Sequence, residues 1–448
     1  MADAKITELT ELTSVESTDL IAVVDDPSGS PVTKKATVSN LTAAKAPIAS
    51  PTFTGTVTLP AVEIQDTSAD HQYVLAVSEL TADRTVTLPL LTGNDEFVFK
   101  DHAQTLTNKT LSTGSKLDAN ADSNFTFNSL ARQAIINGNF DVWQRNTTIA
   151  MTTANAYTAD RWYCETATAG TDKTVSREDG TGVNGSYYCA RVKMVSDVDE
   201  LLTFSQALES QDSIKFRGQK VTLSFYARGG AEFVADNATL VSKIVTGKGT
   251  DQKVLAFTTS ADGVSQNNTL TTGWQKFTCT TTNVIASDIT QIGVSFAFTH
   301  AGSGTTTNYF EITQVQLCAG DVALPFMPKS YEEELRACQR YYEKSYNYTT
   351  IPGTATDTGS FISKSIDTYD LYNNIITMAV LKRTTPTITW YNTSTGGSAS
   401  WRNRTDSSNL STNANGSSIS EKSFWLSQNN ILTANKNYSF HWTADAEL

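Results

Sequence analysis

Charged side chains, clusters of basic residues and long apolar runs are all scarce in this sequence. Charged residues make up 18% of its 448 residues, and the formal net charge is −12. No cluster of Lys and Arg suits phosphate binding, so we expect no nucleic-acid partner. No apolar run approaches the ~20 residues that span a bilayer, and MADAKITELTELT lacks the plan of a signal peptide. We therefore expect a chain made in a cytoplasm, soluble and not inserted into a membrane.

The sequence also lacks the motifs of the common enzyme classes. Only four His are present, without a close pair and without HExxH, so we expect no metal site. No G-x-S-x-G elbow and no glycine-rich phosphate loop occurs, so we expect no cofactor and no enzyme activity. A polysaccharide depolymerase remains an alternative, because it needs only two carboxylates about 5 to 9.5 Å apart. Against it, no long regular β-helical repeat is evident.

Cysteine is rare, and the spacing of its residues does not suggest disulfide pairs. The five residues are odd in number and widely separated, and no CxxC occurs. Buried free thiols are favoured over a disulfide. These cysteines are Cys164, Cys189, Cys279, Cys318 and Cys338.

The residues that are abundant favour β-structure. Thr, Ser and Asn dominate by inspection, and such residues suit strands and turns better than long helices. A single core rarely exceeds roughly 300 residues, so 448 residues imply more than one domain. We predict an all-β chain in five segments. They span residues 1–45, 46–134, 135–329, 330–346 and 347–448.

The middle segment predicts a β-sandwich. KVTLSFYARGG, QIGVSFAF and SYYCARVKMV each alternate apolar and other residues, which predicts one buried and one solvated face. Turn-forming stretches such as EDGTGVNGS separate them. Earlier in the chain, Leu20 to Val24 is a short strand candidate that ends at Asp25.

The stretch from Asp101 to Asn128 has few large apolar side chains for its strand-like alternation. Such a segment cannot offset roughly 1–2 kcal/mol of backbone entropy per residue by itself. We therefore predict a three-fold intertwined β shaft, in which each apolar residue meets two copies of itself; a flexible linker is the alternative. The predicted axis residues are Leu106, Leu111, Leu117, Phe125 and Phe127.

One helix is expected near the end of the middle segment. Ser330 and Glu333 form a capping-box pattern. Tyr331, Leu335, Cys338 and Tyr342 then form a narrow stripe, which fits packing against the sandwich or, as the alternative, a short coiled-coil seam.

The last segment, 347–448, holds four of the seven Trp and predicts a second β-sandwich. Sugar receptors pair aromatic platforms with hydrogen-bonding side chains. Trp401, followed by Arg402 and Arg404, is the best candidate for an exposed aromatic, with Trp390 and Trp425 as further carbohydrate-binding candidates. The alternative is a core position, which we favour for Trp442.

Polar residues surround another tryptophan, Trp143. Asn139, Asp141, Gln144 and Arg145 could cap a sugar or hold the end of a strand, and we favour the strand end.

Several stretches, in this order, resemble bacteriophage tail or head fibre proteins. ITELTELTSVESTDLIAVVD resembles their virion-attachment end, and ASPTFTGTVTLP and QTLTNKTL resemble shaft segments. INGNFDVWQRNTT, YTADRWYC and FEITQVQLCAGDVALPFMPKSYEEELRACQRYYEKSY resemble a jelly-roll-like carbohydrate-binding module, and HWTADAEL resembles the last strand of a fibre C-terminal domain.

This resemblance implies an elongated homotrimeric fibre on the surface of a virion. Residues 1–45 would attach to a tail or head protein, residues 135–329 would form the jelly-roll-like module, and residues 347–448 would form the receptor-binding tip. The expected partner at that tip is a host cell-surface polysaccharide. A virion-borne depolymerase and a purely structural fibre are the alternatives.

Overall fold

The chain divides into two units, Met1–Ser115 and Lys116–Leu448, and most of the regular structure among its described residues is β-strand. The computed structural model describes two sets of residues. In the second unit they are 133–195, 200–235, 239–299, 306–411, 418–428 and 431–448, and in the first unit they are 16, 18–25, 29, 32–39, 62–65, 68 and 72–75.

The described residues of the first unit include two short antiparallel strand pairs. β1 (Leu20–Asp25) pairs with β2 (Val32–Thr37), and β3 (Val62–Gln65) pairs with β4 (Gln72–Leu75). The strand predicted from Leu20 is therefore confirmed. The predicted axis residues, Leu106, Leu111, Leu117, Phe125 and Phe127, lie outside the described residues, so the intertwined shaft and the trimer stay predictions.

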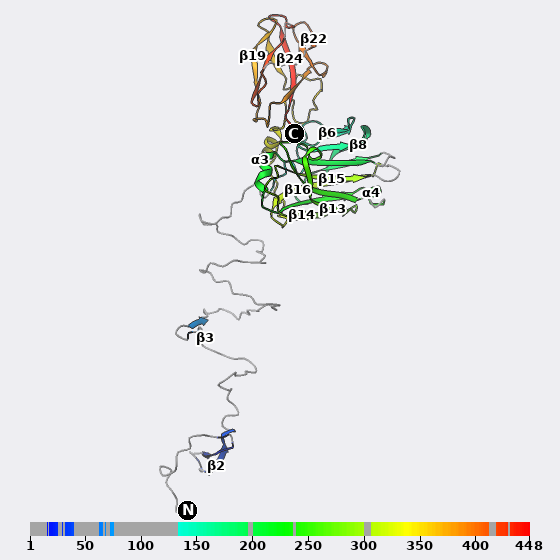
Figure 1. The fold of residues 1–448 in the computed structure, drawn as a ribbon. Coiled ribbons are helices and arrows are strands. Elements are labelled where there is room, and N and C mark those ends of the chain that lie inside the picture. Colours follow the sequence, from blue (N-terminus) through cyan, green and yellow to red (C-terminus); the bar gives the residue numbers. More distant parts are fainter. Residues whose placement is uncertain are drawn as a thin grey trace, which may run out of the picture. The chain divides into compact units, whose positions relative to one another are not determined.

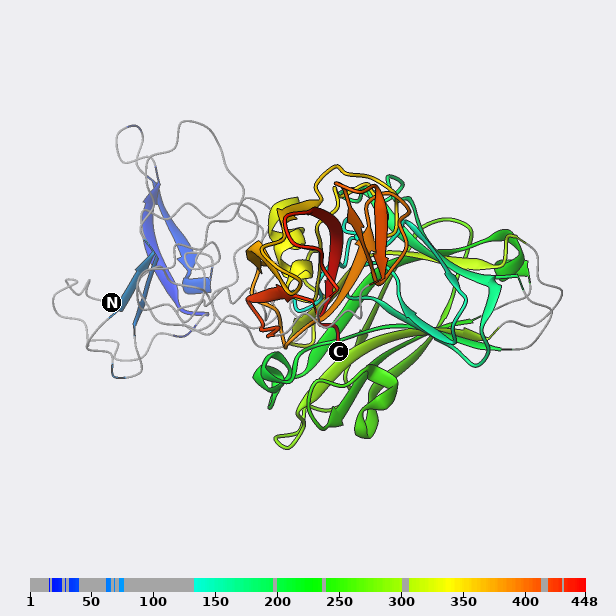
Figure 2. The same cartoon turned by 90° about the horizontal axis from the view of Figure 1, so that it is seen from above.

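Two six-stranded antiparallel sheets form the sandwich of the second unit (Figures 1 and 2). The first sheet has the order β13-β12-β15-β10-β7-β6: Thr258–Thr269, Thr239–Lys248, Gln291–Thr299, Leu201–Ala207, Tyr163–Thr166 and Asn155–Tyr157. The second has the order β14-β11-β16-β9-β8-β5: Gln275–Thr280, Val221–Gly229, Tyr309–Ala319, Tyr188–Met194, Gly170–Asp179 and Thr148–Met151. The sandwich predicted from the alternating segments is confirmed.

Aromatic rings from both sheets meet in the core of the sandwich. Phe225 of β11 lies edge-on to Phe296 of β15, with ring centroids 4.8 Å apart, and Trp162 stacks on Phe204 at the same centroid distance. These side chains are fully or almost fully buried. Each contributes roughly 1.5–3 kcal/mol by leaving water, which is the main stabilisation of the two-sheet arrangement.

The prediction of one solvated face fails for the central strands. From Gln291 to Phe296, every residue of β15 is buried. Its sheet carries a second apolar cluster, formed by Ala207, Val245, Val254 and Phe257. This cluster includes the 3-10 turn η3 (Val254–Ala256), so a connecting segment covers polar positions that the alternation assigned to solvent.

The predicted helix forms as α5 (Tyr331–Gln339), with both hydrogen bonds of the capping box between Ser330 and Glu333. It is shorter than the predicted 330–346, because β17 (Tyr342–Lys344) begins three residues after it ends. The backbone N–H of Asn137 donates to Glu334 Oε1 at 2.5 Å, so α5 lies against its own sandwich, as favoured. Besides η3, the described part of the second unit also contains the short helical segments α3 (Ser210–Ser213), η2 (Ile214–Phe216) and α4 (Ala231–Ala235).

The C-terminal domain is built around β24 (Asn437–Asp445). This strand pairs with β17, β18, β20 and β21, and β19 pairs separately with β23. The remaining strands are β18 (Phe361–Lys364), β19 (Asp370–Thr377), β20 (Thr387–Asn392), β21 (Ser400–Asn403), β22 (Ser408–Ser411) and β23 (Ser423–Ser427). Their inward side chains form a separate apolar core, so this domain has a β architecture of its own.

Ion pairs, one of them fully buried and one partly exposed, join the C-terminal domain to the sandwich. Arg161 pairs with Glu447, and the Arg145 guanidinium lies 3.0 Å from Asp445 and over the ring of Tyr342. Exposed ion pairs contribute little to the free energy of folding, but a buried charge that loses its partner lowers stability strongly. We call this contact between the two domains the seam. The two halves are therefore held together by specific partners.

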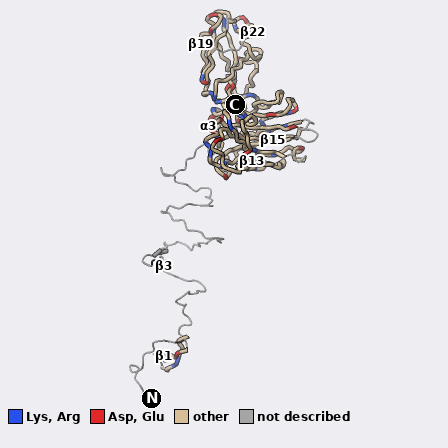
Figure 3. Tube along the Cα trace, viewed as in Figure 1, with Lys and Arg blue, Asp and Glu red and all other residues tan. Residues whose placement is uncertain are grey.

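All five cysteines are free and buried, so the thiol prediction is confirmed. Both signs of charge are interspersed along the described part of the second unit (Figure 3). No helix in the described ranges is long and apolar enough to cross a membrane.

Candidate functional site: a cleft lined by tyrosines

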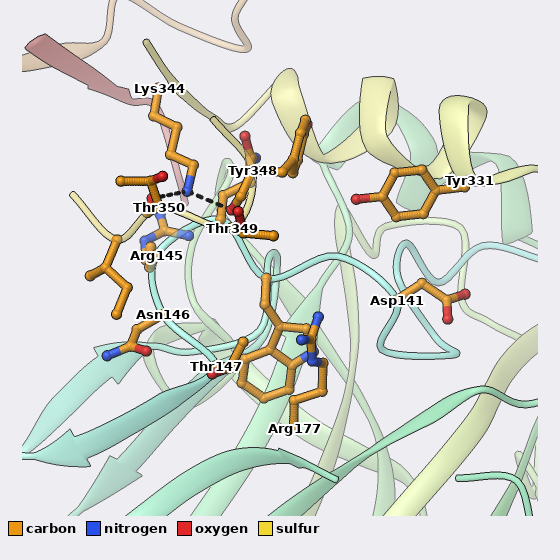
Figure 4. Close-up of a pocket in the computed structure, with 13 residues that line it drawn as sticks. Asp141, Arg145, Asn146, Thr147, Arg177, Tyr331, Lys344, Tyr348, Thr349 and Thr350 are labelled. Carbon is orange, nitrogen blue, oxygen red and sulfur yellow. Dashed lines mark hydrogen bonds between the residues drawn. The ribbon is translucent and has the colours of Figure 1, made fainter. Parts of the chain in front are cut away.

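Two adjoining cavities lie where the sandwich meets α5 and the segment after β17. Their volumes are about 300 and 570 Å³, and both are lined by Asp141, Arg177, Tyr331 and Thr349. Figure 4 shows the smaller one. We call the pair the tyrosine cleft, because its walls include Tyr187, Tyr188, Tyr331 and Tyr348.

A tight loop before β5 forms one wall of the tyrosine cleft. Asn137 adopts a φ of 57°, and its side-chain amide donates to the carbonyl oxygen of Val142 at 2.8 Å. At Gly138 an added Cβ would come within 2.1 Å of the Val315 carbonyl oxygen, so the close approach requires glycine. This geometry fixes Asp141 beside the sheet.

The turn between β8 and β9 supplies the two most closely paired tyrosines. Ser186 donates to Asn139 Oδ1 at 2.8 Å, which ties this turn to the loop before β5. Tyr187 and Tyr188 follow, with ring centroids 4.6 Å apart in an edge-on arrangement. The side chain of Tyr187 is 66% exposed, so its ring offers a free apolar face.

The opposite wall comes from α5 and the segment that follows β17. Tyr331, the first helical residue, is 53% exposed and lies edge-on to Tyr348, with centroids 6.2 Å apart. Lys344 Nζ donates to the carbonyl oxygens of Tyr348 and Thr350, at 3.0 and 2.7 Å, and so fixes this segment (Figure 4). The phenol oxygen of Tyr348 is buried and has no hydrogen-bond partner among the described residues.

Charged groups inside the tyrosine cleft are few. The Arg177 guanidinium carbon lies 4.2 Å from the centroid of the Tyr188 ring. Burial raises the pKa of Asp141, an effect that the hydrogen bond from Asn139 and the nearby Arg177 partly oppose. Burial lowers the pKa of Lys344 to about 8.

Gln144 and Arg145 border the smaller cavity, but their side chains are engaged by other parts of the fold. Gln144 Nε2 donates to the carbonyl oxygen of Tyr342 at 2.7 Å, and its backbone N–H donates to Asp160. Arg145 is engaged by Asp445 and Tyr342. The interpretation of this stretch as a pinned strand end is confirmed for these two residues.

The prediction that Trp401 is exposed is wrong. Trp401 and Trp390 are both fully buried, and Trp401 stacks on Phe440 with centroids 4.3 Å apart. Successive side chains of a strand point to opposite faces, so Trp401 enters the core while Arg402 points away from it. Neither tryptophan presents a ring face to a sugar. Trp442 is buried, as favoured.

The remaining predicted sugar-binding residues lie apart from the tyrosine cleft. Arg402 donates to Asn409 Oδ1 at 3.1 Å, and Arg404 pairs with Asp357 at 2.7 Å. Trp425 is half-buried on β23, and its indole N–H has no partner among the described residues. Their role in sugar binding stays a prediction.

The exposed aromatic residues of the C-terminal domain are tyrosines. Tyr372 is 63% and Tyr369 is 47% exposed, and the neighbouring Ile362, Ile366 and Ile375 are also exposed. In both regions the exposed rings are phenols in or next to turns and element ends. Tyr187 follows the NGS turn and Tyr331 follows the helix cap, so a tyrosine directly after a turn or cap is the sequence signal that could have identified these residues.

One pair of residues resembles the nucleophile and base of a hydrolase. Ser345 Oγ lies 2.9 Å from His441 Nδ1, and His441 Nε2 lies 3.0 Å from the carbonyl oxygen of Thr356, which can only accept. His441 is fully buried, stacks on Tyr346, and has a pKa lowered by burial. The pair lines neither cavity of the tyrosine cleft, so we interpret it as a core contact.

The described residues contain no group of three His, Cys, Asp or Glu that could hold a metal ion. Among the described residues, Asp141 is the one carboxylate that lines either cavity of the tyrosine cleft. The arrangement therefore provides hydrogen-bonding and stacking groups, without the second acid that a glycosidase of the usual kind needs.

No protein-family model and no curated protein matches this chain. Among solved structures, it is similar to the enzymatically active domain of tailspike protein 4 of bacteriophage CBA120, at 12% identity over 42% of this chain and a TM-score of 0.28; it spans 21% of that protein. It is also similar to TmCBM61 in complex with β-1,4-galactotriose, at 12% identity over 35% of this chain and 88% of that chain, with a TM-score of 0.23. A third similar structure is the xylan-binding domain from CBM 22, at 14% identity over 37% of this chain and 90% of that chain, with a TM-score of 0.24. Likenesses at these TM-scores carry no argument for this chain, whose architecture is a β-sandwich joined to a second β domain.

Proposed function

We propose that this chain is a bacteriophage fibre protein that binds glycans of the host surface through the tyrosine cleft. Residues 1–45 would attach it to the virion tail or head, and three copies would form the fibre. The observation that carries the binding proposal is the cleft itself, in which exposed phenol rings adjoin charged and amide side chains. The attachment and the trimer rest on the sequence resemblance and on the sparse apolar residues of 101–128.

The chemistry of the cleft suits a sugar. Sugar rings have apolar C–H faces, which pack on aromatic rings such as Tyr187 and Tyr331, and hydroxyls, which need donors and acceptors at the edge. Asp141 accepts, Arg177 donates, and the unpartnered phenol of Tyr348 can do either. A volume of about 570 Å³ for the larger cavity lies in the range of ligand sites.

Binding without hydrolysis is part of the proposal. The lone carboxylate of the cleft, Asp141, supports it, because both inverting and retaining glycosidases ordinarily use an acid pair. Weak single sites would suffice, since three linked copies on one fibre raise the effective concentration of each site for a surface that repeats its sugars.

The test is binding of the full chain to an array of bacterial polysaccharides, with Tyr187→Ala and Tyr331→Ala as variants. Each should lower binding several-fold, because each removes a stacking face. Tyr372→Ala is the matched control: this residue is 63% exposed, close to the 66% of Tyr187, but lies in the C-terminal domain. Binding lost in the control and kept in the cleft variants would move the receptor site to that domain.

The same samples separate the alternative functions. Release of reducing sugar from a bound polysaccharide would identify a depolymerase. An array and host cells that bind neither the wild-type chain nor any variant would leave a structural fibre. We expect binding without sugar release.

A further inference from the structure

The walls of the tyrosine cleft carry an excess of positive charge. Arg145 is already neutralised by Asp445 and Glu447, at 3.0 and 3.5 Å. The charges left are the cations Arg177 and Lys344 and the single carboxylate of Asp141. The whole chain has a formal net charge of −12, so the composition does not account for this local excess.

Arg177 is the cation that borders both cavities. No ion pair among the described residues includes it; its partner is the face of the Tyr188 ring, 4.2 Å from the guanidinium carbon. Stacking on a ring leaves the N–H edge of a guanidinium free, and that edge matches the two oxygens of a carboxylate. In Figure 4, Arg177 rises from β8 toward the space below α5.

We propose that the glycan bound in the tyrosine cleft carries a carboxylated sugar of the hexuronate type. Its carboxylate would form a bidentate pair with Arg177. Its ring would pack on Tyr187 or Tyr331, which flank Arg177 in the larger cavity. This inference rests on the proposed function, because it names the class of sugar for the same site.

The remaining polar groups accommodate the rest of such a sugar. Asn139 Nδ2 donates to Asp141 at 3.1 Å, which leaves further lone pairs on that carboxylate for sugar hydroxyls. The buried phenol of Tyr348, which has no partner among the described residues, would gain one. A uronate carries the ring hydroxyls of a neutral hexose, and its carboxylate is the feature that distinguishes it.

The experiment uses the full chain and matched sugars. Oligosaccharides of galacturonate, mannuronate and glucuronate are each compared with their carboxyl-reduced derivatives, which keep the rings and linkages and lose the charge. Calorimetry or a biosensor measures the affinity. We expect at least one acidic oligosaccharide to bind about 10- to 100-fold more tightly than its reduced form, the usual worth of a charge-assisted hydrogen bond.

Variants assign that preference to Arg177. Arg177→Gln should abolish the preference for the acid, and Arg177→Lys should restore only part of it, because a lysine lacks the planar fork. Arg336→Gln is the control, since Arg336 is an exposed arginine on α5 outside the cleft walls. Thermal melting of each variant verifies that it is folded.

The outcomes distinguish the two proposals. Acid and reduced forms that bind equally, with binding lost in Tyr331→Ala, would overturn the hexuronate inference and leave glycan binding intact. An acid preference that persists in folded Arg177→Gln would overturn the role of Arg177. No binding of any acidic or reduced sugar, together with a negative polysaccharide array, would remove both proposals.

Discussion

The tyrosine cleft and the tryptophan core of the C-terminal domain use aromatic rings in opposite ways. In the C-terminal domain, Trp390, Trp401 and Phe440 pack on one another and are fully buried. In the cleft, Tyr187 and Tyr331 are more than half exposed, on a turn and at a helix start. In this chain, a high density of aromatic residues along the sequence therefore indicates a core. An aromatic residue at the end of a helix or in a turn indicates the candidate site.

The difference between the buried and the exposed rings predicts the largest effect, a loss of stability, for Trp401→Ala. The substitution removes a fully buried indole with ring contacts to Trp390 and Phe440, and should lower the free energy of unfolding by about 3–5 kcal/mol. Denaturant unfolding followed by tryptophan fluorescence measures it. Tyr372→Ala should change stability by less than about 0.5 kcal/mol.

A core role also predicts what replaces Trp401 best. Trp401→Phe should recover much of the stability, because the ring stays and the indole N–H, buried without a partner among the described residues, is removed. A Trp401→Ala protein with unchanged stability and lost glycan binding would show that the ring acts at a surface, against the burial seen here.

A second expected effect concerns the seam that joins the two domains and supports the cleft. Glu447 pairs with Arg161 and is 3.5 Å from Arg145, and the side chains of Glu447 and Arg161 are almost fully buried. Glu447→Ala leaves two buried guanidinium groups short of a partner, so stability should fall by about 3 kcal/mol. Glu332→Ala, which removes an exposed pair with Arg336, should cost less than about 1 kcal/mol.

A double variant separates an unpaired charge from lost packing at this seam. If the cost arises from the stranded charge, Arg161→Met combined with Glu447→Met should be less destabilising than Glu447→Ala alone. Arg177 lies on β8 of the sandwich, and Lys344 lies on β17, which pairs with β24 of the C-terminal domain. A loosened seam should displace these two cations relative to each other, so Glu447→Ala should also weaken glycan binding. Undiminished stability in Glu447→Ala would show that the seam is held by other contacts.

Local patterns in the sequence predicted the elements of the fold well. Strand β9 follows from the alternation of SYYCARVKMV, and the α5 cap follows from Ser330 and Glu333, and both signals act over a few residues. The pattern could not show that β15 is buried on both faces, because the covering segment, with Val254, lies about forty residues away in the chain. Tertiary packing overrode the two-residue period there.

The candidate site was harder to predict than the fold, because its walls come from distant segments. Asp141, Arg177, Tyr331 and Lys344 are separated by up to about two hundred residues, and no short motif joins them. The polar neighbours Ser400 and Arg402 suggest a surface position for Trp401, and that prediction is wrong. In a strand such neighbours point to the opposite face, so they indicate burial of the residue between them.

A smaller effect is expected at the helix that carries Tyr331. Ser330→Ala removes the side chain that accepts from the Glu333 N–H at 3.3 Å and should cost about 1 kcal/mol. Because the first turn of α5 then frays, glycan affinity should fall a few-fold, whereas Ser420→Ala in the C-terminal domain should leave it unchanged. Weaker thermal stability with full affinity would show that the position of Tyr331 does not depend on the cap.

The smallest expected effect is a pH dependence that belongs to the cleft and not to the tryptophan core. Burial lowers the pKa of Lys344 to about 8, an effect that the nearby Asp160 partly opposes. Lys344 therefore loses its charge as pH rises from 7 to 9, and the affinity for a hexuronate oligosaccharide should fall about two- to five-fold over that interval. A bound carboxylate favours the charged form of Lys344, so binding in this pH range takes up protons. Calorimetry in buffers of different ionisation enthalpy detects that uptake.

Two controls test the assignment to Lys344. Lys344→Met should bind the same sugar with an affinity that does not depend on pH, and the affinity of the wild-type chain for the carboxyl-reduced sugar should not depend on pH either. An affinity of the wild-type chain that stays constant from pH 7 to 9 would mean that Lys344 does not face the ligand and that Arg177 alone supplies the positive charge of the site.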